Sequence, residues 1–341
     1  MACGNPVAHG NRAGGEASGV LSAFRFDAQQ SERVEKWESA CERLDDDQLL
    51  WLALRDPSDD EETAVVDALG LGDELARRLR DSPERASVTD DGKHLYVTLV
   101  AVAGDEDAPV LVPVECVLGK NWVVTAHQDE ITVLEEFLER AEGGSEVGAL
   151  EAPSFVAAVG EWVIASYFRA FEAVEGELEE LDARVMSETP SRDVSGDMSR
   201  LVELRRRIGS LRRALAPHRE VVTSLAHPEL DVHSTERSAQ LFADLERRVT
   251  QALDAARDTK ESTFGSFDLL VARIGQRTND IMKVLTLGTV ILLPATVLGG
   301  IMGMNFKVGL FEYTWLYWVV IAAMLVIAAL VLAVARVRHW I

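Results

Sequence analysis

Residues 284–306 read VLTLGTVILLPATVLGGIMGMNF, and residues 313–335 read YTWLYWVVIAAMLVIAALVLAVA. Neither stretch contains a charged side chain. Each has slightly more than the roughly 20 residues that an α-helix needs to cross the hydrocarbon core of a bilayer. Because only the short linker 307–312 separates them, the two stretches predict a membrane hairpin.

The basic residues around this hairpin predict its orientation. Arg277 and Lys283 precede the first stretch and Arg336 and Arg338 follow the second, whereas the linker holds only Lys307. Since basic residues collect on the cytoplasmic side of membrane proteins, both termini are expected in the cytoplasm and the linker outside. The chain is therefore expected to be a multi-pass protein of the cell (inner) membrane, in contact with membrane lipid.

The remainder of the chain is strongly acidic. The 341 residues carry a formal net charge of −22. Such a protein repels nucleic acid and attracts cations, so no nucleic-acid partner is expected. We find no nucleophile–base pair, phosphate-cradling loop or HExxH pattern, so neither an enzyme nor an organic cofactor is expected.

The region before residue 150 shows the pattern of an α/β domain. Runs rich in β-branched residues at 94–103, 110–118 and 121–127 predict strands. Gly119-Lys120, between the last two runs, predicts a tight hairpin. Helices are expected over Ser39–Arg55, over Asp60–Leu69, over Asp73–Arg80 and over Glu130–Ala141.

From Pro153 onward the pattern is helical. Phe155–Met186 and Asp197–Ala226 predict two long antiparallel helices. A third helix begins at about Thr235 and meets no proline before Pro294, so it is expected to run on into the first membrane span. The expected divisions are a disordered tail (1–23), an α/β cytoplasmic domain (24–150), a helical cytoplasmic region (151–283), the membrane helices (284–306 and 315–337), the external loop between them (307–314) and a cytoplasmic tail (338–341).

One face of the third helix carries a stripe of weakly polar residues. Steps of three and four residues along the helix select Asn279, Met282, Thr286, Thr289, Leu293, Thr296 and Gly300. A heptad-like stripe favours parallel helices around a common axis. Two readings remain open: the small residues let helices pack closely, or the stripe lines a polar pathway with apolar constrictions at Met282 and Leu293. The opposite positions, Val284, Ile291, Leu292 and Val297, are aliphatic.

Several motifs resemble those of the CorA family of divalent-cation channels and transporters. They are Met282-Lys283-Val284-Leu285-Thr286, Pro294, Gly303-Met304-Asn305-Phe306 and the tail Arg336-Val337-Arg338-His339-Trp340-Ile341. The resemblance implies an α/β cytoplasmic domain, long helices and a two-helix transmembrane hairpin in a funnel-like homo-oligomer, a pentamer. It also implies that the first membrane span lines a pore for hydrated Mg²⁺, and also for Co²⁺ or Ni²⁺.

The same resemblance assigns roles to particular residues. Gly303, Met304 and Asn305 would form the selectivity filter, and Leu285 would join the constriction. Asp268 would bind a regulatory Mg²⁺ between subunits, with Asp244 as a second regulatory site, although Arg78 occupies the expected position of the acidic partner. Arg336 and Arg338 would surround the cytoplasmic mouth.

Two other functions remain open from the sequence. One is a zinc transporter of the same superfamily. The other is a membrane-anchored scaffold or sensor without transport, although an anchor would need only apolar residues and no polar stripe.

Overall fold

The computed structural model describes residues 20–27, 31–41, 44–45, 48–71, 74–80, 85–105, 108–129, 131, 134, 136–137, 151–187, 194–226, 235–303 and 314–337. The chain divides into two compact units. The first comprises Met1–Ala183 and Arg192–Gly265, and the second comprises Arg184–Ser191 and Ser266–Ile341.

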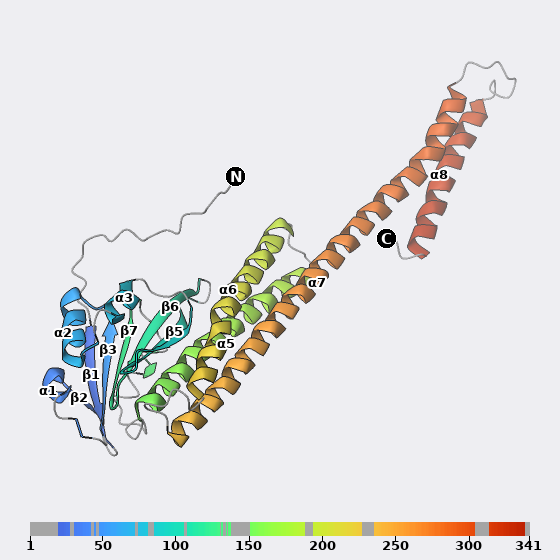
Figure 1. Cartoon of the computed structure of the whole chain (residues 1–341). Helices are drawn as coiled ribbons and strands as arrows, with labels where there is room; N and C mark the ends of the chain where they lie inside the picture. Colours follow the sequence, from blue (N-terminus) through green and yellow to red (C-terminus); the bar gives the residue numbers. More distant parts are fainter. Residues whose placement is uncertain are drawn as a thin grey trace, which may run out of the picture. The chain divides into compact units, whose positions relative to one another are not determined.

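A mixed sheet forms the centre of the first unit (Figure 1). Its strands lie in the order β2-β1-β3-β7-β6-β5-β4, and only β3 and β7 are parallel neighbours. The strands are β1 (Val20–Phe26), β2 (Ser31–Arg33), β3 (Leu49–Arg55), β4 (Ser87–Asp90), β5 (Leu95–Ala103), β6 (Val110–Leu118) and β7 (Trp122–His127).

Helices cover both faces of this sheet, which makes three layers (Figure 1). The short helices α1 (Trp37–Cys41), α2 (Asp59–Leu69) and α3 (Glu74–Arg80) lie on one face. The other face packs against α5 (Ala152–Met186), α6 (Val194–Ala226) and the first part of α7 (Glu236–Met302). Each face therefore contributes to a hydrophobic core of its own.

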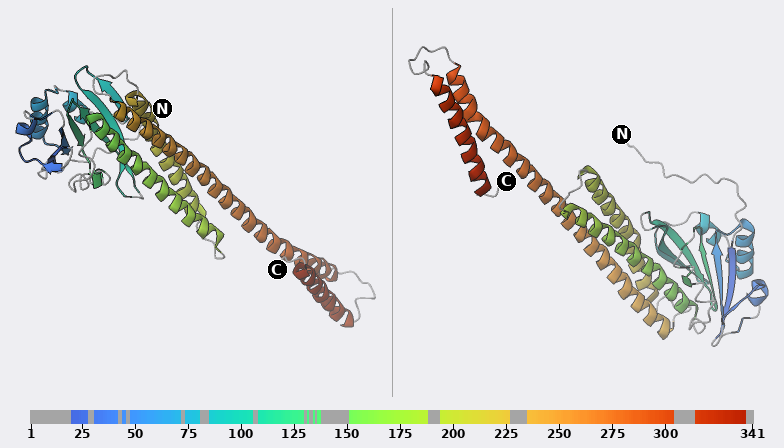
Figure 2. Two further views of the ribbon diagram at one scale, coloured as in Figure 1. Left: turned by 90° about the horizontal axis from the view of Figure 1, so that it is seen from below. Right: turned by 180° about the vertical axis from the view of Figure 1, so that it is seen from behind.

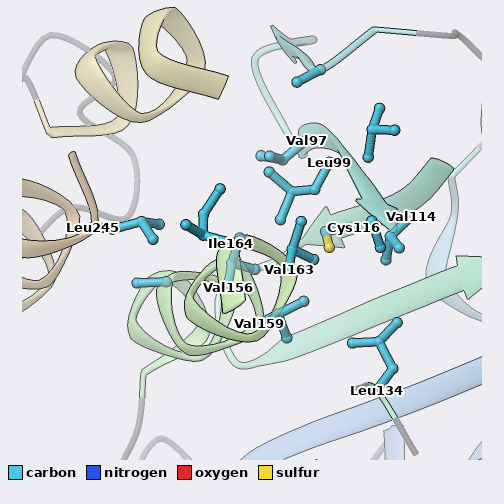
Figure 3. Packing of buried hydrophobic residues seen from close by; sticks show 14 of the residues in the cluster. Val97, Leu99, Val114, Cys116, Leu134, Val156, Val159, Val163, Ile164 and Leu245 are labelled. Atoms are coloured by element: carbon cyan, nitrogen blue, oxygen red, sulfur yellow. The ribbon is translucent and has the colours of Figure 1, made fainter. Parts of the chain in front are cut away.

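Figure 3 shows an aliphatic part of the core beneath α5 to α7, which also contains aromatic side chains such as Trp51 and Phe155. Val114 and Cys116 of β6 point toward Val159 and Val163 of α5, while Leu245 of α7 approaches α5 from its far side. Helix α5 therefore packs against the sheet on one side and against α7 on the other. This packing joins the sheet to the long helices.

Strand β3 corrects one prediction. The sequence predicts a helix over 39–55, but Leu49–Arg55 is a strand, and the described helix nearby is Trp37–Cys41. Trp51 belongs to the core beneath the long helices, and Leu50 and Leu52 belong to the core beneath α1 to α3. Because both faces are covered, the strand has no polar alternation that would distinguish it from a buried helix.

The other predicted strands and most predicted helices are confirmed, with small shifts at their ends. The predicted hairpin at Gly119 is also confirmed: its N–H donates to the Trp122 carbonyl at 3.0 Å. A Cβ at Gly119 would lie 2.2 Å from the Trp122 ring, so no other residue fits this turn without rearrangement. The expected disordered tail is too long, since β1 begins at Val20. The helix predicted over 130–141 lies mostly outside the described residues.

Side chains of the long helices complete the free edge of β5. The Val100 N–H donates to His218 Nε2 at 3.0 Å, and the Val102 N–H donates to Ser166 Oγ at 2.9 Å. Tyr167 donates its hydroxyl to the Val100 carbonyl at 2.9 Å. These bonds satisfy backbone groups beyond the end of the short strand β4, which would otherwise be buried without partners.

Candidate functional site

The second unit holds two apolar helices, the last part of α7 and all of α8 (Thr314–Val337), which lie side by side (Figures 1 and 2). Both are long and apolar enough to cross a membrane. In their most apolar windows, 0% and 6% of the residues are buried within the chain. An apolar surface of this extent requires lipid or further protein around it.

A narrow face of each helix is partly buried, in keeping with contact between the two. The half-buried positions are Leu287, Gly288, Ile291, Pro294, Ala295 and Leu298 on α7, and Val320, Ile321, Met324, Ile327, Ala328 and Val331 on α8. Their spacing of three and four residues is that of helices packed along their lengths.

The predicted pore-lining residues lie on the other side of α7. All of them are exposed in the single chain: Asn279, Met282, Leu285, Thr286, Thr289, Leu293, Thr296 and Gly300. Thr286, at the margin of this stripe, also lines a small apolar groove shared with α8. At 3.6 residues per turn the stripe is centred roughly opposite the face that packs against α8.

The four positions expected opposite the stripe do not share one environment. Ile291 is half-buried on the face toward α8. Val284, Leu292 and Val297 are 70%, 66% and 53% exposed, so no other part of this chain covers them. The sequence pattern marked them as aliphatic but could not tell which of them are covered by α8.

The threonines of the stripe share one hydrogen-bond geometry. Each hydroxyl donates to the carbonyl four residues earlier, at 2.7 Å for Thr286, 2.9 Å for Thr289 and 2.8 Å for Thr296. The hydroxyl hydrogen is therefore committed to the helix, and the oxygen presents its remaining lone pairs outward as an acceptor.

Helix α7 ends at Met302, directly before the predicted filter. The Gly303 N–H donates to the Gly299 carbonyl at 3.0 Å, in the turn that follows Met302. Met304 and Asn305 lie outside the described residues. A Cβ at Gly299 or Gly300 would meet no other heavy atom within 4 Å, so this chain leaves the space beside them open.

The two predicted regulatory carboxylates differ in their surroundings. Asp268 is exposed on α7. Asp244 makes an ion pair with Arg247 one turn later, which occupies a carboxylate oxygen that a metal would need. Among the described residues, no three His, Cys, Asp or Glu side chains form a group that could hold a metal ion.

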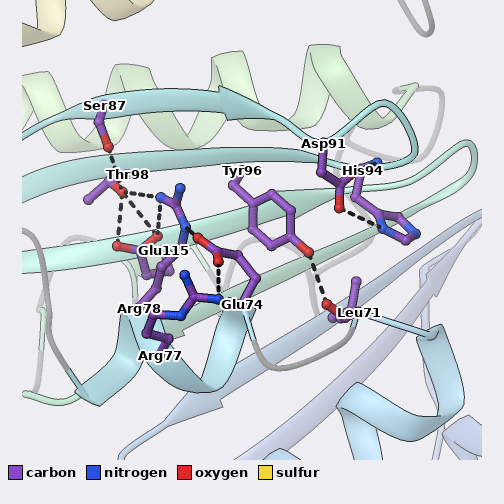
Figure 4. A network of polar contacts seen from close by, with 10 residues as sticks. All are labelled: Leu71, Glu74, Arg77, Arg78, Ser87, Asp91, His94, Tyr96, Thr98 and Glu115. Carbon is purple, nitrogen blue, oxygen red and sulfur yellow. Dashed lines mark hydrogen bonds and ion pairs between the residues drawn. The ribbon is translucent and has the colours of Figure 1, made fainter.

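Arg78 is engaged inside the first unit (Figure 4). Its Nε donates to Glu74 Oε1 at 2.9 Å, and its Nη1 lies 3.7 Å from Glu115 Oε2. Its guanidinium also lies over the Tyr96 ring, 5.2 Å from the centroid. Burial raises the pKa of Glu115, while hydrogen bonds from Thr98 and the charge of Arg78 favour its ionised form. Arg78 therefore serves the packing of α3 on the sheet.

Charged groups lie near the ends of the apolar segments. Lys283 Nζ lies 2.8 Å from Asp280 Oδ1, an ion pair absent from the sequence predictions although the spacing of three residues on a helix indicates it. Arg336 is exposed in the last turn of α8. Arg338 lies outside the described residues.

Comparison with known proteins gives a consistent result. The family model described as CorA-like Mg2+ transporter protein matches residues 46–336. The cobalt/magnesium transport protein CorA of Thermotoga maritima is 28% identical over 180 residues, which are 52% of this chain and 50% of that protein. The protein of the same name from Methanocaldococcus jannaschii is 24% identical over 308 residues, which are 87% of this chain and 93% of that protein.

A solved structure extends the likeness to the fold. The complete structure of the CorA magnesium transporter from Methanocaldococcus jannaschii superimposes with a TM-score of 0.76 at 23% identity. The superposition covers 94% of this chain and 98% of that one.

Proposed function

Because the chain belongs to the family of CorA-like Mg²⁺ transporter proteins, we propose that it carries hydrated Mg²⁺ across the cell membrane through a pore lined by α7. Co²⁺ and Ni²⁺ are further candidate substrates. Both termini would lie in the cytoplasm, as the basic residues beside the hairpin predict. The names of the two curated relatives, cobalt/magnesium transport proteins, support Mg²⁺ and Co²⁺ among these ions.

The exposed stripe of α7 is the observation that carries the proposal. Mg²⁺ releases its water ligands reluctantly, so a fast pathway must recognise the hydrated ion. Water bound to a cation donates its hydrogens outward. The oxygens of Thr286, Thr289 and Thr296 are acceptors whose own hydrogens are already committed, so they suit those waters. The absence of carboxylates from 284–306 favours rapid release.

Several copies of the chain must assemble around such a pathway. Two helices cannot enclose water, and polar groups at membrane depth must face protein or a water-filled cavity. The stripe lies opposite the face that packs against α8, so α7 can turn it toward a common axis while α8 faces lipid. We propose a homo-oligomer, and a pentamer by resemblance to the family.

The ends of the pathway have separate roles in this proposal. Gly303, Met304 and Asn305 form the outer selectivity filter, where amide oxygens contact the water shell of the ion. Met282, Leu285 and Leu293 form apolar rings that close the path by excluding water. Arg336 and Arg338 surround the cytoplasmic mouth.

Regulation by cytoplasmic Mg²⁺ is the remaining part of the proposal. Exposed Asp268 is the main candidate ligand, and Asp244 is the second, for which the ion would have to displace Arg247. Arg78, which is paired with Glu74 and Glu115, cannot supply a ligand from a neighbouring subunit, because a guanidinium is a cation with no lone pair to offer a metal. We therefore expect shallow inhibition by internal Mg²⁺.

Ion uptake into liposomes containing the purified chain tests the function. Asn305→Ala should abolish Mg²⁺ uptake without changing the oligomer, whereas Asn121→Ala, a matched change in a loop of the first unit, should leave it intact. Parallel uptake of Co²⁺, Ni²⁺ and Zn²⁺ identifies the preferred ion. Undiminished uptake by Asn305→Ala would contradict the filter assignment, and absence of any metal uptake by the wild type would contradict transport.

A further inference from the structure

A groove on the first unit, between α6 and α7, has no role in the proposed transport. It encloses about 720 Å³, a volume within the range of small-molecule sites. Its lining residues are Val202, Arg205, Arg206, Ile208, Gly209, Arg212, Arg213, Ala216 and Lys260.

Five of these lining residues are cations, in a chain whose net charge is −22. Among the described residues, none of the five forms an ion pair with a carboxylate. Other arginines of α6 behave differently: Arg200 and Arg207 both make ion pairs with Glu177 of α5. The groove therefore concentrates positive charge that the fold has not neutralised.

Packing holds part of this charge in place. The Arg205 guanidinium lies 5.1 Å, and the Lys260 ammonium 5.9 Å, from the centroid of the Phe264 ring. Gly209 leaves the wall of the groove without a side chain, and a Cβ there would lie 3.4 Å from Arg213 Nη1. A cation–π contact keeps long side chains in defined positions while their donors remain available.

The spacing of the arginines indicates the shape of a ligand. Arg205 and Arg206 are separated from Arg212 and Arg213 by seven residues, which is about 10 Å along a helix. Like charges at this density repel one another and oppose folding unless an anion binds. A guanidinium matches a phosphate group with two parallel hydrogen bonds. A ligand with several adjacent phosphates can engage both arginine pairs at once, whereas a single phosphate can engage only one.

We infer that this groove binds an anion with a chain of phosphate groups, either inorganic polyphosphate or a nucleoside triphosphate. Both share the chemistry that the arginines recognise. Because the Phe264 ring already contacts Arg205 and Lys260, recognition rests on the phosphates rather than on stacking of a base. The inference does not depend on transport, and it assigns the groove a ligand independent of the pore.

Calorimetric titration of the detergent-solubilised full chain tests the inference. Sodium triphosphate, ATP and AMP are titrated separately in metal-free buffer, so that chelation does not contribute heat. Triphosphate should bind saturably with one site per chain, and AMP should bind far more weakly. If ATP binds as tightly as triphosphate, nucleoside triphosphates are included among the ligands; if ATP binds much more weakly, inorganic polyphosphate is the ligand.

A pair of double variants with equal change of charge gives the control. Arg205→Gln/Arg212→Gln should weaken triphosphate binding ten-fold or more, because each lost charged hydrogen bond is worth at least a factor of about ten. Arg247→Gln/Arg257→Gln removes two arginines that are 70% and 75% exposed in ion pairs elsewhere on α7, and binding should stay within about two-fold. Circular dichroism verifies that both variants fold.

Three outcomes would overturn the inference. The first is no saturable binding of any of the three anions. The second is equal weakening by both double variants, which would mean that only the net charge matters. The third is a change of oligomer mass, by light scattering, in Arg205→Gln/Arg212→Gln alone, which would make the groove a contact with the acidic surface of a second copy.

Discussion

His218 of α6 bonds the sheet through one ring nitrogen and its own helix through the other. Since Nε2 accepts from the Val100 N–H, the ring hydrogen lies on Nδ1, which is 3.1 Å from the carbonyl oxygens of Ala214 and Leu215. Complete burial lowers the pKa of His218 to about 4. A second ring proton, on Nε2, would point at the Val100 N–H, which is a donor and cannot accept a hydrogen bond.

This environment predicts a pH-dependent stability. The unfolded chain binds a proton at His218 near pH 6.5 and the folded chain only near pH 4, so the contribution is complete above pH 6.5 and declines as the pH falls toward 4. The loss amounts to about 3 kcal/mol of the free energy of unfolding. Urea titrations of wild type and His218→Gln between pH 7 and about 4 check this. Parallel pH dependences would contradict it.

The threonine oxygens of α7 predict a change in flux. Thr289→Val keeps the shape of the side chain and removes its acceptor, at a cost of about 1 kcal/mol for each hydrogen bond to the water shell. Mg²⁺ flux should fall several-fold. Thr278→Val is the matched control, because the Thr278 hydroxyl also donates to the carbonyl four residues earlier, at 2.9 Å, but precedes the apolar segment. Equal effects of the two changes would mean that only helix geometry is affected.

Among the helices, α5 and α7 approach closely at Gly160. A Cβ at this position would lie 2.6 Å from Leu245 Cδ2, and Leu245 is only 2% exposed. Gly176, on the same helix, is exposed and would meet nothing within 4 Å. The two glycines therefore share a helix but differ in whether a side chain fits.

We expect opposite effects from the same substitution at these glycines. Gly176→Ala should stabilise the chain by up to about 1 kcal/mol, the gain in helix propensity. Gly160→Ala has the same gain but also overfills a packed interface, which costs about 1 to 3 kcal/mol and should make it net destabilising. Urea unfolding of both variants measures the difference. A stabilising Gly160→Ala would mean that Leu245 moves aside freely.

In the assembled molecule, the exposed stripe of α7 predicts which residues meet across subunits. Cysteine at Thr289, Leu293 or Thr296 should cross-link between chains under mild oxidation, in a background without Cys3, Cys41 and Cys116. Cysteine at Ile291 or Leu298, on the half-buried face toward α8, should cross-link far less. Electrophoresis without reductant gives the yield. Equal yields on both faces would mean that α7 does not surround a common axis.

Local patterns in the sequence were sufficient for most of the helices, for three strands and for the resemblance to the family. An apolar run without charge predicts a membrane helix. Apolar residues at every second position predict a strand, and apolar residues at every third or fourth position predict a helix. These periods can be read from the sequence because they reflect only the geometry of one element. The stripe from Asn279 to Gly300 was visible for the same reason.

Only the tertiary structure decided which elements meet. Strand β3 pairs in parallel with β7, although the two strands lie far apart in the sequence. No local period encodes such a partner. Burial on both faces removed the alternation of β3 that would have identified it. The engagement of Arg78 with Glu115 and the separation of α7 into a packed face and an exposed stripe also depend on neighbours distant in sequence, because burial is a property of the assembled fold.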